Sequence, residues 1–253
     1  MIYFASDFHL GIDAKLPSKQ RERQIVRWLD SIKTKATAIY IVGDIFDFYF
    51  EYKTVVPKGY VRLLGKLAEL SDSGVEMHFF IGNHDMWIFN YFEEELGIKT
   101  HRKPIIVTLS GKKFLIGHGD GLGPGDHGYK FLKKIFGSPI CQWLFARIHP
   151  NFGIGLANFW SQRSKDKNMG TDDFENIEKE WLYQYAEEKL KSEPDIDYFI
   201  FGHRHIPIDY TLSNGQSRYV NLGQWLFANS YAVFDGSGVK LNFFENADGK
   251  IFP

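Results

Sequence analysis

Five short polar clusters, spread over almost the whole 253-residue chain, each follow a short apolar run rich in β-forming residues. The apolar runs cover residues 2–5, 38–42, 77–81, 114–116 and 198–201. The clusters after them are Asp7-Phe8-His9, Gly43-Asp44-Ile45-Phe46-Asp47, Gly82-Asn83-His84-Asp85, Gly117-His118-Gly119-Asp120 and Gly202-His203-Arg204-His205. Runs of this kind, separated by helical patterns, predict buried strands of an α/β sheet. Since side chains just past the carboxyl ends of such strands face a shared crevice, we expect the clusters to meet in one site.

The residue types in these clusters indicate a centre for two divalent metal ions. Two ions about 3.5–4 Å apart need a bridging anion between them, with imidazole and oxygen ligands around it. Asp44 suits the bridge because a carboxylate has two oxygens and a full negative charge. Asp-x-His, His-x-His, Asn83 and His118 supply further oxygens and nitrogens. One such motif alone is more often a loop coincidence, but all five in this order favour metal binding.

This ordered set of motifs, from residue 1 to about 245, resembles the calcineurin-like metallophosphoesterase superfamily. The resemblance implies an α/β fold in which a β-sandwich flanked by helices carries a two-metal site. It implies that one ion is held by Asp7, His9, Asp44 and His205, and the other by Asp44, Asn83, His118 and His203. It also implies that His84 is catalytic, contacting phosphate and assisting the leaving group without binding metal. Asp47 or Asp85 would orient these groups through hydrogen bonds without contacting the metal ions.

Length, charge and cysteine content limit the other possibilities. Motifs from Asp7 to His205 around one site argue for a single domain over residues 1–253. A formal net charge of −1 gives no footprint for nucleic acid, so we expect no nucleic-acid partner, and we predict no protein partner. The single cysteine, Cys141, indicates a reducing compartment. Without a visible signal peptide or an apolar stretch of spanning length, we expect a cytoplasmic protein.

Apolar periodicity predicts the remaining elements. Helices are expected over residues 18–33, 61–70, 87–96 and 171–192. Strands are expected over residues 105–109 and 113–116, joined at Ser110-Gly111, and over 218–221, 231–234 and 239–244.

One stretch, residues 129–165, contains no Asp or Glu but interleaves Lys and Arg with many aromatic and aliphatic residues. Pro139, Pro150 and Gly153 divide it into short helices, and with residues 171–192 it predicts an inserted helical cap over 126–192. Apolar faces flanked by basic residues are typical of interfacial membrane elements, so we expect the cap to bind the inner membrane surface. A cap packed only on itself, or a clamp for single-stranded nucleic acid, would use similar residues.

Further residues sharpen the resemblance, namely His118-Gly119-Asp120, Asp126-His127-Gly128-Tyr129, Ser164, Asn168 and Gly202-His203-Arg204-His205. With these residues the chain resembles the UDP-2,3-diacylglucosamine hydrolases of lipid A biosynthesis. The substrate contacts that this resemblance implies are Asn83, His84, Asp126, Ser164, Asn168 and His203. The chain departs from the better-known branch at two positions. His84 stands in place of an arginine, and Thr171 in place of a lysine that contacts substrate.

We therefore expect a dimetal hydrolase, peripheral on the inner membrane, that cleaves the pyrophosphate of UDP-2,3-diacylglucosamine. Its products would be UMP and 2,3-diacylglucosamine 1-phosphate. Mn²⁺ is the expected ion because mixed oxygen and imidazole ligands without thiolate suit it, although Zn²⁺ or Fe would also fit. The alternative is a metallophosphatase or phosphodiesterase acting on another nucleotide-linked lipid or a soluble nucleotide. A non-catalytic scaffold would be expected to lose ligands, and none is missing.

Overall fold

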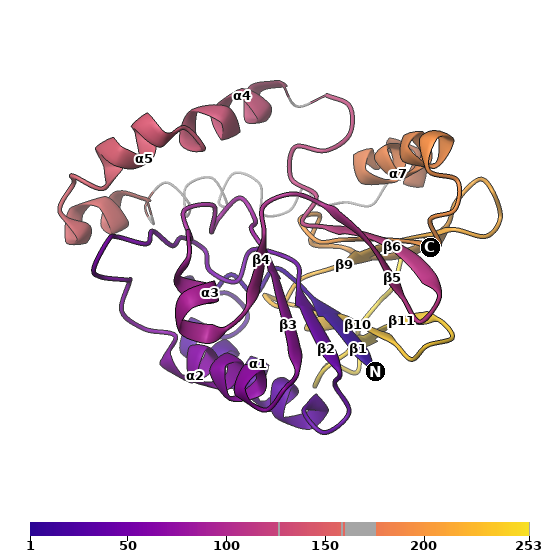
Figure 1. The fold of residues 1–253 in the computed structure, drawn as a ribbon, viewed down its shortest axis with the longest axis horizontal. Helices are drawn as coiled ribbons and strands as arrows, with labels where there is room; N and C mark the ends of the chain where they lie inside the picture. Colours follow the sequence, from indigo (N-terminus) through magenta and orange to yellow (C-terminus); the bar gives the residue numbers. More distant parts are fainter. Residues whose placement is uncertain (126, 158, 160–175, 253) are drawn as a thin grey trace.

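Two β-sheets pack face to face at the centre of the structure, and helices cover their outer faces (Figure 1). The computed structural model describes residues 1–125, 127–157, 159 and 176–252. The first sheet has the strand order β11 (Val239–Phe243), β10 (Ser230–Phe234), β1 (Ile2–Ala5), β2 (Ala38–Ile41), β3 (Glu76–Phe80) and β4 (Lys99–His101). The second has the order β5 (Ile105–Leu109), β6 (Lys112–Gly117), β7 (Tyr198–Phe201), β9 (Arg218–Leu222) and β8 (Pro207–Thr211). The predicted α/β class, a β-sandwich flanked by helices, is confirmed.

The strands that precede the five clusters lie in the middle of the two sheets and run parallel to one another. β2 pairs in parallel with both β1 and β3, and Ala5 lies opposite Ile41. In the second sheet, β7 pairs in parallel with both β6 and β9, and Gly117 lies opposite Phe201. The carboxyl ends of neighbouring strands, and the clusters after them, therefore lie at the same edge of each sheet.

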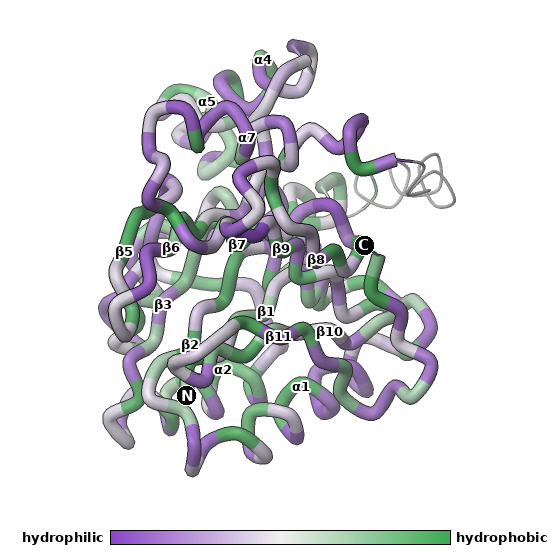
Figure 2. The backbone as a smooth tube through the Cα atoms, turned by 90° about the vertical axis from the view of Figure 1, so that its right-hand side faces the viewer, coloured by the Kyte–Doolittle hydropathy of each residue, from purple (hydrophilic) through white to green (hydrophobic). Residues whose placement is uncertain are grey.

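Alternation of side chains along the strands divides the core into layers. On β1, Phe4 faces the other sheet and stacks on Tyr40 and Phe114, whereas Tyr3 and Ala5 face the helices. The helices on the outer faces are α1 (Ser18–Ile32), α2 (Val61–Asp72) and α3 (Tyr91–Leu96) on the first sheet, and α7 (Trp181–Ser192) on the second. Figure 2 shows α1 and α2 below the first sheet and α7 above the second.

Helix α1 forms where apolar residues recur at helical spacing. Ile25, Trp28, Leu29 and Ile32 are buried against the first sheet, while most intervening polar side chains remain in solvent. The hairpin predicted at Ser110-Gly111 is also present, with β5 and β6 pairing antiparallel. Both turn residues have positive φ, 46° and 80°, as a two-residue turn of type I′ requires.

The helix predicted over residues 87–96 begins later, at Tyr91. The Glu51 carboxylate accepts hydrogen bonds from the backbone N–H groups of Phe89, Asn90 and Tyr91. Trp87 instead forms a bridge with Phe50. These contacts hold the residues before Tyr91 outside the helix, so the predicted start was wrong by about one turn.

The helix predicted over residues 171–192 is also shorter, because α7 begins at Trp181. Residues 171–175 lie outside the described part of the chain. A single turn of 3₁₀-helix, η1 (Ile177–Lys179), comes first, and Glu180 is then extended with its side chain accepting the N–H of Leu182. Two short edge strands, β4 and β8, were not predicted. β8 begins with Pro207, which is tolerated at the start of an edge strand.

The described residues of the predicted cap, 126–192, fall into two groups. α4 (His127–Phe136), α5 (Pro139–Phe145) and a helix over residues 150–157 lie above the loops at the edge of the sandwich (Figure 1). α7, in contrast, packs on the second sheet through Leu182 and Leu190. Among the described residues, every helix is too short or too polar to cross a bilayer. The boundaries of the cap, and the single domain over residues 1–253, stay predictions.

Candidate metal centre

Hydrogen bonds join four of the five cluster loops at one edge of the sandwich, and Asp44 and Asp85 join the loop of residues 82–85 to them. The N–H of Asp7 donates to the carbonyl of Gly43 at 3.0 Å, which joins the first two clusters. The N–H of Gly202 donates to the carbonyl of His118, also at 3.0 Å, which joins the last two. The N–H of His203 donates to Oδ2 of Asp7 at 3.0 Å and links the two sheets. The predicted convergence of distant segments is therefore present.

Most of the candidate ligands sit on strained backbone. Asp7, His9, Asp44, His203 and His205 have φ values of 56°, 44°, 54°, 69° and 57°. Non-glycine residues with positive φ are uncommon, and each costs on the order of 1–3 kcal/mol unless the surroundings enforce it. Such strain is typical of functional sites, where side chains must point in directions that regular structure does not allow.

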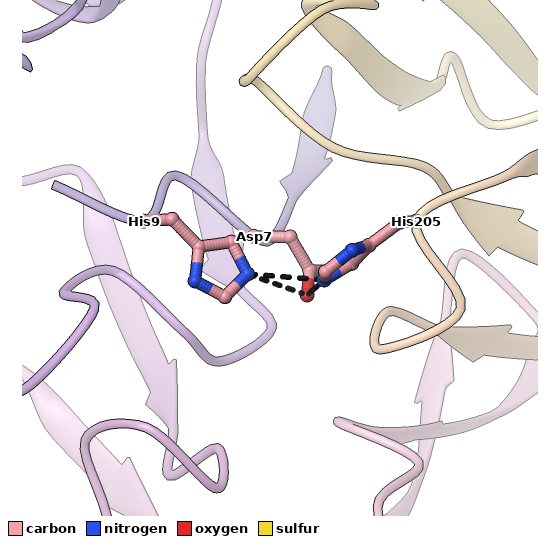
Figure 3. A group of neighbouring side chains, drawn as sticks. All are labelled: Asp7, His9 and His205. Atoms are coloured by element: carbon pink, nitrogen blue, oxygen red, sulfur yellow. Dashed lines mark hydrogen bonds and ion pairs between the residues drawn. The ribbon is translucent and has the colours of Figure 1, made fainter. Parts of the chain in front are cut away.

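Asp7, His9 and His205 form the first group of converging side chains (Figure 3). The Nε2 atoms of the two histidines are 3.0 Å apart. Oδ1 of Asp7 lies 3.2 Å from Nε2 of His205 and 3.7 Å from Nε2 of His9. Three atoms that can each donate a lone pair thus surround one point, which is the arrangement that a cation needs.

Asp44, His118, His203 and Asn83 form the second group. Nδ1 of His118 donates to the carbonyl of Val42 at 2.8 Å, so the neutral ring has its lone pair on Nε2. That Nε2 lies 3.2 Å from Oδ2 of Asp44 and 3.2 Å from Oδ1 of Asn83. Three acceptors facing one another in this way repel unless a cation or a proton lies between them.

The Asp44 carboxylate connects the two groups. Its Oδ1 accepts the backbone N–H of His84 at 2.9 Å, whereas Oδ2 lies 3.2 Å from His118 and 3.9 Å from His9. Within the described part of the chain, Oδ2 of Asp44 and Oδ1 of Asp7 are buried oxygens that accept no hydrogen bond. An unpaired buried charge is costly, and a metal ion at each group would satisfy these oxygens. The residues therefore fit a two-metal centre.

The electrostatics of the cluster favour positive charge. Burial alone would raise the pKa of Asp44, but the imidazoles of His118 and His84 hold it well below the usual range. Burial also acts to lower the pKa of His118, yet the Asp44 carboxylate raises it well above its usual value. Burial, together with His118, lowers the pKa of His203 to about 3. Ionised carboxylates beside a neutral imidazole form a suitable environment for a divalent ion.

His84 lies against the first group rather than apart from it. Its ring centroid is 4.8 Å from that of His9, and it forms a third converging set with His9 and Asp44. Nδ1 of His84 donates to the carbonyl of Asp47 at 2.7 Å, and the Asp47 carboxylate lies 3.4 Å from Nδ1 of His9. Asp47 thus orients two histidines, as a supporting residue does.

Asp85 supports the site by joining two loops. Its carboxylate is fully buried and accepts the N–H groups of Gly82 and Ile45, both at 2.8 Å. These bonds fix the loops after β3 and β2 relative to each other. The loop that carries Asn83 and His84 is thereby placed against Asp44.

Arg21 is a supporting residue that the sequence analysis missed. It is fully buried, and its guanidinium donates to the carbonyls of Phe8, His9, Ile12 and Leu16 at 2.6–3.1 Å. The loop that carries Asp7 and His9 is therefore held in place by the guanidinium group of Arg21. A signal was available, because positions 21, 25 and 28 share the buried face of α1.

The predicted substrate contacts divide into two sets. Asn83, His84 and His203 lie in the cluster described above. Asp126, Ser164, Asn168 and the divergent Thr171 lie outside the described residues. The roles assigned to all of these side chains, and to the metal ligands, stay predictions.

Two mixed sheets that bring His and Asp loops together at one edge fit a metal-dependent hydrolase. Residues 1–207 match the family model of calcineurin-like phosphoesterases, and the chain belongs to that family. A protein from Porphyromonas gingivalis (strain ATCC BAA-308 / W83) named UDP-2,3-diacylglucosamine hydrolase is 42% identical, over 98% of this chain and 98% of its own length. Calcineurin-like phosphoesterases use a dimetal site, and this chain is a metal-dependent hydrolase.

More distant relatives have the same name. The UDP-2,3-diacylglucosamine hydrolase of Aeromonas salmonicida (strain A449) is 28% identical over 91% of this chain and 88% of its own length. Among solved structures, an archaeal phosphodiesterase has 11% sequence identity and a TM-score of 0.47, covering 96% of this chain and 98% of that chain.

Steric crowding at Gly82 gives a test of the bridging position. A side-chain carbon there would lie 2.1 Å from Oδ1 of Asp44, so Gly82→Ala should displace the carboxylate that connects both groups. We expect the purified variant to lose both metal ions, as measured by elemental analysis. Gly65→Ala, in α2 with no atom within 4 Å of the added carbon, is the matched control and should keep both ions. A Gly82→Ala protein with two tightly bound ions would contradict the bridging role.

Proposed function

We propose that the cluster holds two divalent ions. Asp7, His9, Asp44 and His205 would hold one, and Asp44, Asn83, His118 and His203 the other. The buried Asp7 and Asp44 oxygens that accept no hydrogen bond from described residues support this assignment, because each lies where one group converges. The donors are oxygens and imidazole nitrogens without thiolate, which favours Mn²⁺ and also accommodates Zn²⁺ or Fe.

We further propose that the reaction is hydrolysis of the pyrophosphate bond of UDP-2,3-diacylglucosamine, giving UMP and 2,3-diacylglucosamine 1-phosphate. The observation that carries this proposal is the relative of that name, 42% identical over nearly the full length of both chains. Bound ions would supply Lewis acidity at the phosphoryl oxygens and lower the pKa of the attacking water.

We assign His84 the role of proton donor to the leaving group. Because its Nδ1 donates to the carbonyl of Asp47, a proton on Nε2 exists only in the imidazolium form. That form can donate to an oxygen as it leaves phosphorus. The position of His84 between Asp44 and His9 would place it beside the reacting phosphate. Asn83 and His203 would contact the same phosphate, and Asp126, Ser164 and Asn168 would bind other parts of the substrate.

The exposed apolar face of the cap supports recognition of acyl chains. Phe131, Ile140 and Trp143 have 64%, 73% and 57% of their surface exposed on α4 and α5. Burying apolar surface of this kind on a lipid is favourable in proportion to its area. We propose that the same face contacts the inner membrane, and that the enzyme is cytoplasmic and peripheral on that membrane.

Two cap residues point inward instead. The Phe145 ring lies 5.8, 4.8 and 4.7 Å from the rings of Phe48, Phe50 and Trp87, so it attaches α5 to the body of the protein. Lys133 binds Asp120 beside the candidate metal centre. Neither side chain is therefore suited to a test of lipid contact.

Replacing His84 tests whether this residue acts in catalysis or binds a metal ion. If it acts on the leaving group without binding metal, His84→Ala should keep two ions per chain and lower kcat by about 10²–10⁴-fold, the usual contribution of general acid catalysis. Elemental analysis and turnover with Mn²⁺ measure the two effects. Loss of one ion would make His84 a ligand, and unchanged turnover would remove it from the mechanism.

The substrate is tested by release of UMP from UDP-2,3-diacylglucosamine compared with UDP-N-acetylglucosamine in the presence of Mn²⁺. The unmodified enzyme should prefer the acylated substrate strongly, because each buried methylene contributes about 0.8 kcal/mol. Ile140→Ser and Trp143→Ser should raise KM for that substrate by about tenfold or more and leave a small artificial phosphodiester unaffected. Equal rates on both nucleotides would favour the soluble-nucleotide alternative.

The matched control is Val61→Ser. Val61 is 74% exposed on α2, so its replacement removes a similar exposed apolar group from a helix outside the cap. Its KM for the acylated substrate should equal that of the unmodified enzyme. Circular dichroism of all variants checks that the fold is retained.

A further inference from the structure

The two ends of the inserted segment meet beside the candidate metal centre. The chain enters the insertion through residues 119–123 and returns through residues 180–182, and we call these two stretches the neck. They pack so closely that a side-chain carbon on Gly123 would lie 2.5 Å from the carbonyl oxygen of Trp181. One on Gly119 would lie 2.9 Å from Leu182. The neck thus begins directly after His118 and ends at the start of α7.

On the first side of the neck, a buried carboxylate holds helix α4. Asp120 is 6% exposed, and its Oδ2 accepts the Tyr129 hydroxyl at 2.7 Å and Nζ of Lys133 at 2.6 Å. Nζ of Lys133 also donates to the backbone carbonyl of Asp120 at 3.0 Å. Both donors lie in the first two turns of α4. A shift of α4 would therefore pull on the loop that carries His118.

On the second side, a buried glutamate holds the last cluster. Glu180 is 4% exposed and accepts Nε of Arg204 through both carboxylate oxygens, at 3.0 and 2.8 Å. The Arg204 guanidinium also lies 4.3 Å from the centre of the Trp181 ring. Arg204 stands between His203 and His205, so this contact fixes the loop that bears both histidines.

Aromatic rings from both sides of the neck enclose one of the candidate ligands. The rings of Tyr129 and Trp181 lie 6.3 and 6.4 Å from the ring of His203. One comes from the beginning of α4 and the other from the beginning of α7. His203 is therefore held between the two ends of the insertion, in addition to its own loop.

We propose that the neck couples the second metal ion to the position of the cap, with Asp120 and Glu180 as positioning residues for His118 and His203. Coupling between two events is reciprocal. An ion that orders these histidines therefore also orders α4, and displacement of α4 lowers the affinity of the site for the ion. Coupling of this kind usually changes affinity by about 5–150-fold. The proposal rests on the proposed metal ligands and is independent of the lipid substrate.

The test uses the full chain, stripped of metal and then titrated with Mn²⁺. Elemental analysis gives the number of ions bound, and hydrogen–deuterium exchange follows α4 (residues 127–136), with α2 (residues 61–72) as an internal reference. In the unmodified protein two ions should bind, and exchange in α4 should slow at least about fivefold as the second one binds. Exchange in α2 should not change.

Asp120→Asn removes the charge that holds α4 while preserving the size of the side chain. It should retain one ion, bind the second about 10–100-fold more weakly, and lose the slowing of exchange in α4. Glu180→Gln should have the same effect from the other side of the neck, and it decides the question if Asp120→Asn does not fold. Asp197→Asn is the matched control, because Asp197 binds Lys112 at 2.8 Å at the opposite end of β7.

The outcomes distinguish the proposed coupling from the proposed dimetal centre on which it rests. Two bound ions with unchanged exchange in α4, or neck variants that bind both ions as the unmodified protein does, would overturn the coupling alone. An unmodified protein that binds no Mn²⁺ would overturn the dimetal centre as well. Loss of an ion from Asp197→Asn would show that the effect is not specific to the neck.

Discussion

The site depends on how the Asp44 carboxylate is held. One of its oxygens is fixed by the N–H of His84, and the other points between His118 and His9 without a hydrogen bond from any described residue. This arrangement requires the loops after β2 and β3 to lie in contact, which Gly82 permits and Asp85 enforces. The sandwich serves mainly to bring loops from both sheets to this one carboxylate.

Holding these groups together without a counter-ion is unfavourable. Two buried carboxylate oxygens accept no hydrogen bond within the described structure, and five candidate ligands have left-handed backbone. The three packed layers of the core stabilise the fold enough to maintain that arrangement. Metal binding would relieve the electrostatic part of the cost, so affinity for metal and stability of the fold are linked. The raised pKa of His118 has the same origin, because a proton can partly neutralise Asp44 where an ion would do so fully.

The sequence predicted the strands and the convergence of the clusters because both depend on short, regular patterns. Apolar runs such as 38–42 and 198–201 are buried on both faces, and His-x-His and Asp-x-His follow such strands directly. The supporting residues were harder to predict. Arg21 acts through carbonyl groups, and Glu51 delays the start of a predicted helix through long-range contacts. Helical spacing places Arg21 on the buried face of α1, but neither its carbonyl partners nor the contacts of Glu51 follow from local periodicity. Phe145 points inward because it packs on Trp87. The local sequence could not predict this direction, since Phe145 is as apolar as its exposed neighbours Trp143 and Leu144.

The candidate metal ligands and the exposed face of the cap are held by different parts of the structure. The candidate metal ligands come from loops fixed at both sheets, whereas α4 and α5 attach to the body through a few contacts, such as those of Phe145 and Asp120. A change on the exposed face of the cap therefore leaves the contacts that hold Asp44 unchanged. A change at the neck would in addition disturb the metal centre, because Asp120 holds α4 beside the loop of His118 and Glu180 holds the loop of His203 through Arg204. If the cap binds the acyl chains as proposed, substrate preference can vary over most of its surface, whereas the neck residues are constrained by their contacts with the loops of His118 and His203.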